Sequence, residues 1–335
     1  MSERWKALVV GCGRIGGTFN EGPGDPHVMT HALAYRRHPG FDLAACVEPD
    51  ADRRAEFIRR WHVAKGYATL DEALAAERYD IISVANSTAA HIETLSRLKD
   101  ASMRALFVEK PIGADPTAAA PLVRHFAARG IPFAVNFQRR WDTEMHALRD
   151  EIRGGEWGPL RTVIGRYMRG IVNNAGHMVN LIAFLLGETP RAVAAQHPRW
   201  DGVPNDPTVD ARLELTDGTP IHLIGSEGRD WAVFDTTLAF AKGEIVIEKF
   251  GFQVRRRRPK PAAAITGVPT LDDGAIVETK YGEAMLRALD EIRAWKPGMR
   301  LVSDGENALE TLAVNDRLRS MALARRNPDH TKEAK

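Results

Sequence analysis

The sequence predicts an α/β protein of two domains, with a doubly wound parallel sheet first and a mostly antiparallel sheet second. A chain of 335 residues is longer than one hydrophobic core usually serves. Up to about residue 140, continuous apolar runs alternate with amphipathic stretches, as in βαβ units. Beyond that point, short alternating stretches are joined by turn signals, as in antiparallel sheets. We expect domains at 1–138 and 139–325, with a last helix able to return to the first domain and a frayed tail at 326–335.

In the first domain the apolar runs predict buried parallel strands, and the 3.6-residue periodicity between them predicts the covering helices. The expected strands are 6–11, 42–47, 79–85, 105–108 and 131–135. The expected helices are 29–38, 51–60, 71–77, 89–99 and 115–129.

In the second domain a strand follows one helix and precedes another, and a series of strands then builds the antiparallel sheet. We expect helices at 142–154 and 174–186, strands at 159–169, 191–198, 208–216, 219–227, 231–240 and 243–249, and terminal helices at 280–295 and 304–324.

Composition argues against several classes of partner. The net charge of +2 gives no reason to expect nucleic acid or a membrane as a partner. The run Arg255–Arg258 is read either as a solvated strand end or as a contact for a phosphate-bearing substrate. The two cysteines make no disulfide framework, and no Cys/His cluster has metal-ligand spacing. With no apolar signal region at the N-terminus, we expect a cytoplasmic protein.

A glycine turn follows the first strand, with the sequence Gly11-Cys12-Gly13-Arg14-Ile15-Gly16. The first glycine permits the tight turn, the second lets backbone approach a pyrophosphate, and the third allows close helix packing. This pattern is typical of a Rossmann dinucleotide site, and residues 11, 13, 14, 15 and 16 are its candidate cofactor-binding positions.

An acidic residue at the end of the second strand indicates which dinucleotide binds. Glu48 can accept hydrogen bonds from the adenosine ribose and would repel a 2′-phosphate. We therefore expect NAD, while Arg53 and Arg54 nearby keep NADP open as the less favoured cofactor. Residues 18–27 interrupt the helix after the turn, which should restart with Thr30 as its cap. That insertion either covers the cofactor or is a surface loop.

Several motifs in a fixed order resemble those of the Gfo/Idh/MocA oxidoreductases (glucose–fructose oxidoreductase, inositol dehydrogenase and rhizopine catabolism proteins). They are the glycine turn, Val84–His91, Glu109-Lys110-Pro111, Phe137–Asp142, Gly155–Gly158 and Gly176–Leu181. The resemblance implies a Rossmann domain followed by a domain with an open, mostly antiparallel sheet. It also implies hydride transfer between NAD(P) and a sugar, cyclitol or nucleotide sugar, and association through the open sheet into a homodimer or homotetramer.

The resemblance places a lysine at the reacting centre. Lys110 follows the fourth strand and can point over the carboxyl edge of the sheet, where ligands bind in such folds. By resemblance it touches the reacting oxygen, while Glu109 contacts the nicotinamide ribose or holds the lysine. Pro111 can introduce a cis bond there. The alternative for Lys110 is a surface lysine before a proline turn.

His177 is the best candidate for the general acid or base, because its ordinary pKa lies near neutrality. Four residues earlier, Asn173 stands where the family often has Asp, so it can orient a substrate hydroxyl but cannot accept its proton. The alternatives are a helix N-cap for Asn173 and a packed core histidine for His177. Asn180 also replaces a family aspartate, which leaves its role open.

Weaker candidates lie at the same strand ends. Asn86 and His91 are expected near the nicotinamide ribose, or are loop and cap residues. One of Arg139 and Arg140, preferably Arg140, is expected to reach substrate; the alternative is a salt bridge at the domain junction. His27 and His31 are only weak candidates for the site. The leading interpretation is an NAD(P)-dependent dehydrogenase or reductase acting on CH–OH groups. A redox-neutral NAD-dependent glycosidase and a non-catalytic nucleotide or sugar sensor are the alternatives.

Overall fold

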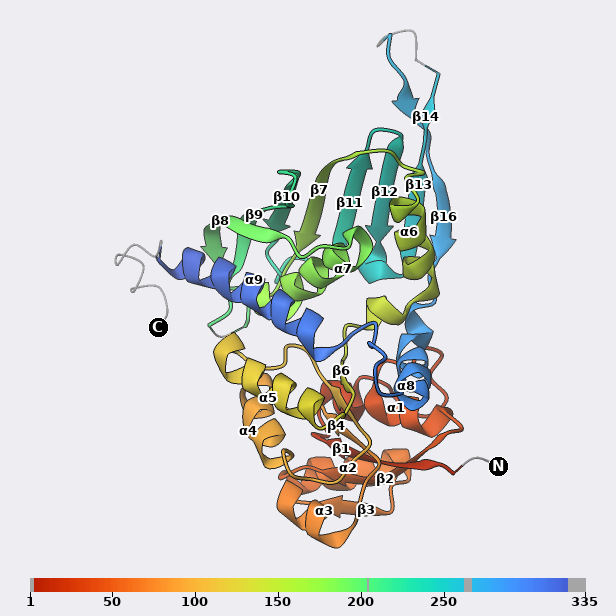
Figure 1. The fold of residues 1–335 in the computed structure, drawn as a ribbon, viewed down its shortest axis with the longest axis vertical. Helices are drawn as coiled ribbons and strands as arrows, with labels where there is room; N and C mark the ends of the chain where they lie inside the picture. Colours follow the sequence, from red (N-terminus) through yellow and green to blue (C-terminus); the bar gives the residue numbers. More distant parts are fainter. Residues whose placement is uncertain (1–2, 204, 262–266, 325–335) are drawn as a thin grey trace. The chain divides into compact units, whose positions relative to one another are not determined.

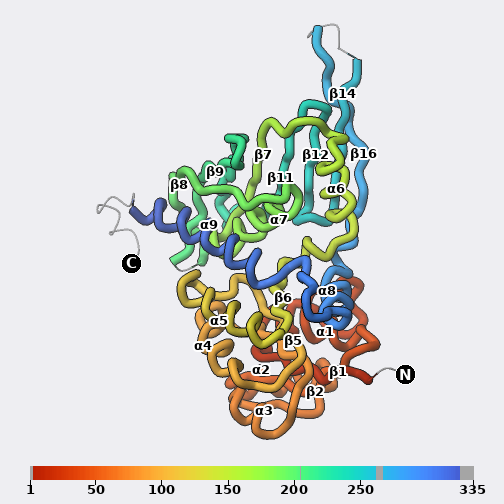
Figure 2. The backbone as a smooth tube through the Cα atoms, viewed as in Figure 1, coloured from red at the N-terminus to blue at the C-terminus, as the bar shows by residue number. Residues whose placement is uncertain are grey.

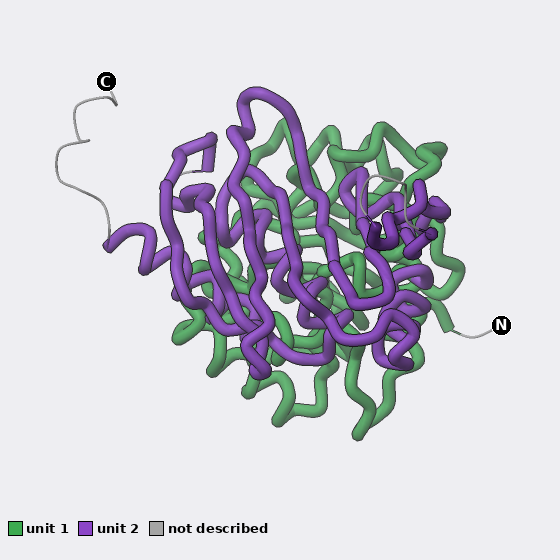
Figure 3. Tube along the Cα trace, turned by 90° about the horizontal axis from the view of Figure 1, so that it is seen from above, with its two compact units in different colours: residues 1–142, 280–309 green, residues 143–279, 310–335 purple. Residues whose placement is uncertain are grey.

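The chain divides into two compact units in a computed structural model that describes residues 3–203, 205–261 and 267–324. Unit 1 comprises residues 1–142 and 280–309, and unit 2 comprises residues 143–279 and 310–335 (Figure 3). The segment 280–309 thus belongs to unit 1 although it follows the second sheet in the sequence. The tail expected at 326–335 lies outside the described residues.

Unit 1 is built on a six-stranded parallel sheet in the order β3-β2-β1-β4-β5-β6 (Figure 1). Strand order reverses between β1 and β4, so the loops that follow these two strands open a crevice at the carboxyl edge. The strands are β1 Trp5–Val10, β2 Phe41–Val47, β3 Lys65–Tyr67, β4 Ile81–Val84, β5 Ala105–Val108 and β6 Phe133–Val135. The predicted parallel sheet is confirmed, with β3 as an additional edge strand.

Helices separate these strands as predicted. Thr30 accepts a hydrogen bond from the backbone N–H of Leu33 and caps α1, which confirms the predicted restart after the insertion. Along the chain, α8 follows the second sheet but contacts α1 within unit 1 (Figure 2). The helices are α1 His31–Arg37, α2 Ala51–Trp61, α3 Leu70–Ala76, α4 Thr88–Arg97, α5 Pro116–Ala128 and α8 Ala284–Ala294, with a 3-10 turn at Gln138–Trp141.

Unit 2 is built on an eight-stranded mixed sheet in the order β16-β13-β12-β11-β7-β10-β9-β8. Its pairs are antiparallel except β7 with β10, as the predicted mostly antiparallel sheet requires. The strands are β7 Leu160–Tyr167, β8 Arg191–Arg199, β9 Thr208–Glu214, β10 Pro220–Gly225, β11 Asp235–Phe240, β12 Gly243–Glu248, β13 Gln253–Arg257 and β16 Ala275–Glu278. The short strands β14 Pro259–Lys260 and β15 Thr270–Leu271 pair separately.

One face of this sheet is covered by α7 Gly176–Leu186, which contacts α6 Thr143–Arg153 (Figure 1). Gly165 of β7 lies directly under this helix, because a Cβ at Gly165 would come within 2.0 Å of the Met178 sulfur. The buried side chains of β7 and β10 lie on this inner face, as the strand period of two demands. The chain division between the units falls within the long helix α9 Gly305–Ala324, after residue 309.

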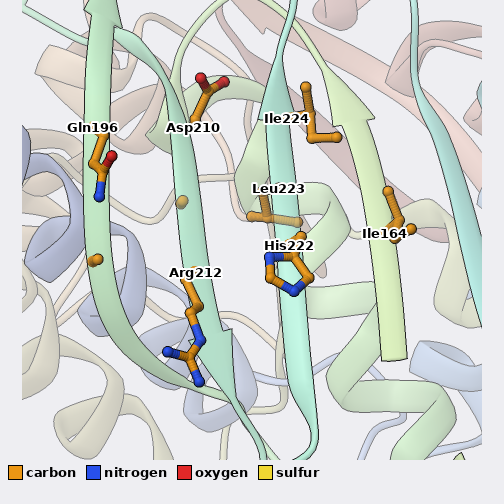
Figure 4. A pocket seen from close by; sticks show the side chains of 9 residues that line it. Ile164, Gln196, Asp210, Arg212, His222, Leu223 and Ile224 are labelled. Carbon is orange, nitrogen blue, oxygen red and sulfur yellow. The ribbon is translucent and has the colours of Figure 1, made fainter. Parts of the chain in front are cut away.

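The opposite, outer face of the sheet is open. Ile164 and Ile224 are 39% and 45% exposed there. They border a hollow of about 340 Å³ that also receives Arg212 and His222 from neighbouring strands (Figure 4). Its remaining lining residues are Ala194, Gln196, Asp210, Ala211 and Leu223. An apolar patch with a polar rim on an open sheet face is typical of an association surface.

The arginine run lies in and just after β13, and its guanidinium groups contact groups of the same unit. Arg255 binds Glu248 at 2.7 Å, and Arg257 binds Glu244 at 2.9 Å. Arg256 contacts both Glu144 and Glu151 at 2.6 Å, and Arg258 lies 3.4 Å over the Trp157 ring. These contacts favour a structural role for the run over recognition of a phosphate.

Within the described ranges, no helix combines the length and the apolar character needed to cross a bilayer.

Candidate active site

Three glycines after β1 shape the turn at the crevice of unit 1. Gly11 has φ +98°, and a Cβ there would come within 2.4 Å of the Asn86 backbone nitrogen after β4. A Cβ on Gly16 would lie 2.0 Å from the Gly11 carbonyl oxygen. By contrast, a Cβ on Gly13 would meet nothing within 4 Å. The open space over Gly13 is where a pyrophosphate can approach backbone N–H groups, so the turn fits a dinucleotide.

The helix after this turn is interrupted, as the sequence predicts. Residues 14–18 form one wide turn, and Arg14 is exposed with its guanidinium 4.8 Å over the Phe19 ring. Within the insertion, the buried Asn20 donates to the His27 carbonyl and accepts from the Met29 N–H. The insertion is therefore folded around Asn20.

Glu48 lies beside the glycine turn at the end of β2. Its Oε2 accepts a hydrogen bond from the Cys12 N–H at 3.0 Å, and its Oε1 accepts one from the Asp50 N–H at 3.2 Å. Arg53 approaches the same Oε1 at 3.4 Å. These contacts hold a carboxylate next to the turn, as ribose recognition by NAD sites requires. The Cys12 thiol forms a hydrogen bond with Cys46 and is buried, and both effects raise the pKa of this thiol. Cys12 is therefore a protonated core thiol.

Asn86 and His91 lie on the loop and helix that follow β4. The Asn86 amide donates to the Thr94 hydroxyl at 2.8 Å. His91 is buried, with Nδ1 2.8 Å from the Pro111 carbonyl oxygen and Nε2 3.1 Å from the Asn86 carbonyl oxygen. Burial lowers the pKa of His91, although both carbonyls raise it. His91 therefore joins the loop after β4 to the loop after β5.

Glu109, Lys110 and Pro111 follow β5 at the carboxyl edge of the sheet. The Glu109 N–H donates to the Val84 carbonyl at 2.8 Å and continues the strand pairing to this point. The Lys110–Pro111 peptide bond is cis, one of the two conformations that the proline allowed. Lys110 is half-buried, whereas Glu109 is buried. The local backbone therefore fixes both residues at the edge where ligands bind in such folds.

The Glu109 carboxylate has two partners, His31, which had only a weak claim in the sequence, and Asn136, which had none. His31 Nε2 lies 2.9 Å from Glu109 Oε1, and the Asn136 amide donates to the same oxygen at 2.5 Å. Burial raises the pKa of Glu109, but His31, Asn136 and the charge of Lys110 outweigh it and lower that pKa below its ordinary value. Glu109 is thus a buried carboxylate. His31 and Asn136 stand at strand and helix ends like many other polar residues, so only the fold could single them out.

In unit 2 the segment between β7 and α7 is held by two aspartates that sequence reasoning missed. Asp206 accepts from the N–H groups of Val172 and Asn173 at 2.9 and 2.8 Å. Asp201 accepts from the Arg169 N–H at 2.5 Å and from the Thr208 hydroxyl at 2.8 Å. Burial raises the pKa of Asp206 despite these donors. In the sequence both aspartates look like ordinary turn residues.

Asn173 and His177 come from the end of that segment and the first turn of α7. The Asn173 amide donates to the Arg169 carbonyl at 3.0 Å. It does not cap α7, whose N-cap is Ala175, so the alternative N-cap interpretation is wrong. His177 is half-buried, with its ring 6.3 Å from that of the buried Phe234. Asn180 is buried and donates to the Thr311 hydroxyl at 2.9 Å, which gives it a structural contact in unit 2.

The two arginines after β6 are buried in unit 1. Arg140 donates to the Val302 carbonyl at 3.0 Å, and Arg139 lies 4.8 Å over the Tyr281 ring. Both contacts tie the end of β6 to the segment 280–309. A substrate role for Arg140 stays a prediction.

Comparison with known proteins agrees with this description. Residues 5–137 match the GFO_IDH_MocA profile, described as an oxidoreductase family with an NAD-binding Rossmann fold. This match confirms the predicted resemblance and the predicted NAD-type cofactor for the Rossmann domain. The glycine turn and Glu48 stay our predicted residues for holding NAD.

Named relatives are distant. A D-apiose dehydrogenase from Paraburkholderia graminis is 22% identical over 58% of this chain and 52% of its own length. An inositol 2-dehydrogenase from Rhizobium meliloti is 26% identical over 77% of this chain and 83% of its own length. The chain thus spans about half the length of the first of these curated relatives.

Solved structures show the same fold over almost the whole chain. A 3-ketoreductase from Actinomadura kijaniata, in complex with NADP, matches with a TM-score of 0.77 at 16% identity, covering 96% of this chain and 98% of that one. At that identity the likeness establishes the fold alone.

Proposed function

We propose that this protein is an NAD-dependent oxidoreductase that interconverts a secondary alcohol and a ketone on a sugar, cyclitol or nucleotide sugar. Lys110 and His177 handle the proton of the reacting hydroxyl. The buried Glu109 carboxylate directly before Lys110, at the carboxyl edge of a dinucleotide-binding sheet, carries the proposal. The names of the relatives, a D-apiose dehydrogenase and inositol 2-dehydrogenases, support a polyhydroxylated substrate.

The proposed chemistry divides the work among three side chains. NAD, when bound, supplies the hydride acceptor. Lys110 binds the reacting oxygen and stabilises the negative charge that develops there. His177 takes the hydroxyl proton in the oxidative direction and returns it in the reductive direction. Asn173 orients a neighbouring hydroxyl through hydrogen bonds. It does not serve as the base, because an amide cannot accept the proton.

The test is nicotinamide absorbance during a screen of sugars, cyclitols and nucleotide sugars, with NAD and with NADP. Lys110→Met and His177→Asn should each reduce kcat by about a hundredfold or more, the usual contribution of a positioned acid or base. Lys242→Met, at an exposed turn in unit 2, is the matched control and should leave kcat unchanged.

Other outcomes discriminate between the remaining classes. NADH formation that survives both substitutions would contradict the assigned roles. A protein that binds NAD tightly and cleaves a glycoside without net NADH would be a redox-neutral glycosidase. Tight binding of NAD or sugar with neither reaction would indicate a sensor.

We also propose that the protein associates with itself through the outer face of the unit 2 sheet. The exposed Ile164 and Ile224 beside Arg212 and His222 support this surface (Figure 4). The cytoplasm remains our predicted location, with Cys12 and Cys46 both as free thiols.

A further inference from the structure

A line of buried polar side chains runs behind Glu109 in unit 1. Tyr35 Oη lies 2.7 Å from Ser83 Oγ, which lies 2.9 Å from His31 Nδ1. The other ring nitrogen of His31, Nε2, lies 2.9 Å from Glu109 Oε1. Tyr35, Ser83 and His31 are fully buried. Burying a polar group costs free energy unless it has a hydrogen-bond partner, and each of these groups has one.

The direction of these hydrogen bonds follows from the carboxylate. An ionised Glu109 can only accept, so His31 must carry a proton on Nε2. If the ring is neutral, Nδ1 accepts from the Ser83 hydroxyl, and Ser83 in turn accepts from the Tyr35 hydroxyl. If the ring is charged, Nδ1 donates to Ser83 instead. In both cases the Nε2 proton points at Glu109.

We propose that His31 is a positioning residue for the reaction: its Nε2–H holds the Glu109 carboxylate in the place that orients Lys110. This inference rests on the proposed function of Lys110. His31 acts through Glu109 and not on the substrate itself.

The surroundings of His31 allow it to hold a precise position. Its ring stands edge-on to Phe107 of β5, with ring centroids 4.6 Å apart, and Ser83 of β4 fixes its far nitrogen. The ring therefore bridges α1 to β5, the strand that Glu109 follows. On the other side of Lys110, the Pro111 carbonyl contacts His91. The lysine backbone is thus flanked by two residues that buried histidines hold.

Two substitutions of His31 separate positioning from simple packing. The amide of Asn reaches the place of Nδ1, whereas the amide of Gln reaches the place of Nε2 and keeps a donor for Glu109. Both remove the ring that packs on Phe107, so their effects on stability are matched. We expect His31→Asn to lower kcat by about ten- to a hundredfold, the cost of a misplaced catalytic group. His31→Gln should retain at least about tenfold more of kcat than His31→Asn.

The control is His38→Asn, which removes another buried histidine of unit 1 that contacts a carboxylate, Asp290, at 2.9 Å. It should lower stability and leave kcat unchanged. Equal kcat values for the two His31 variants, or an Asn variant as active as the wild type, would overturn the proposal.

A second measurement covers the case in which the variants do not fold. Imidazole nitrogen NMR of the wild-type protein, without substrate, should show a proton on His31 Nε2. A neutral ring protonated only on Nδ1 would overturn the proposal. Because this measurement needs no turnover, its failure is distinct from failure of the proposed function, which would appear as wild-type protein inactive with every substrate.

Discussion

Alanine at Gly13 and at Gly16 should separate cofactor binding from folding within one turn. Gly13 has φ −75°, and a Cβ there meets nothing within 4 Å, so alanine fits the free protein. The loss of unfolded-state freedom should even stabilise that variant by about 0.4–1 kcal/mol. A Cβ on Gly16 would lie 2.0 Å from the Gly11 carbonyl oxygen, so backbone must move. Such overpacking costs about 1–3 kcal/mol.

NAD binding should respond in the opposite way at Gly13. The added methyl group occupies the space that the pyrophosphate needs, and we expect Kd for NAD to rise at least about tenfold. At a concentration one hundred times the wild-type Kd, NAD stabilises the wild type by about 2.7 kcal/mol. With a tenfold weaker Kd, the same concentration would stabilise Gly13→Ala by only about 1.4 kcal/mol.

Urea unfolding with and without NAD measures both quantities in one experiment, and calorimetric titration gives Kd directly. A Gly13→Ala protein that binds NAD as tightly as the wild type would refute the placement of the dinucleotide over this turn. A Gly16→Ala protein as stable as the wild type would refute the packing argument.

Three further predictions concern charge and association. Glu48→Ser should raise affinity for NADP relative to NAD by at least about tenfold, because it removes a repulsive carboxylate beside Arg53; titration with both dinucleotides measures this ratio. Glu151→Gln should lower stability at pH 7 by about 1 kcal/mol after solvent screening, because it breaks the contact with Arg256. Although burial raises the pKa of Glu151, Arg256 outweighs it and lowers that pKa below 4.5. The stabilisation is therefore present above that pH and lost as the pH falls through the folded pKa. The difference in unfolding free energy between the wild type and Glu151→Gln, measured by urea unfolding, should be smaller at pH 3 than at pH 7. Ile224→Asp should reduce the molar mass in light scattering, and an unchanged oligomer would contradict association through the outer face.

Local patterns in the sequence were sufficient for much of unit 1. Apolar runs of strand length and amphipathic helices are properties of neighbouring residues, so β1, β2, β4, β5 and β6 could be predicted with small errors at their ends. The glycine turn could also be predicted, because the conformational freedom of glycine is local. Glu109 and Lys110 were found through their place after a strand and through the resemblance.

Strands without a local hydrophobic signal were missed. β3 is a short edge strand of polar residues, and β13 contains the arginine run. Those arginines form a strand because carboxylates neutralise their charge: Glu244 and Glu248 from the neighbouring strand, and Glu151 from a segment far away in the sequence. Periodicity within a single segment cannot reveal such partners.

By itself, the sequence determined the fold class and the dinucleotide turn, because each depends on local residue types and spacing, while Lys110 and His177 remain its predictions for proton transfer. Only the tertiary structure decided which polar groups meet. It brought His31 and Asn136 to the Glu109 carboxylate, Asp201 and Asp206 to the segment before α7, and residues 280–309 into unit 1. These contacts join residues far apart in the chain, and their energies depend on burial, which a single sequence does not contain.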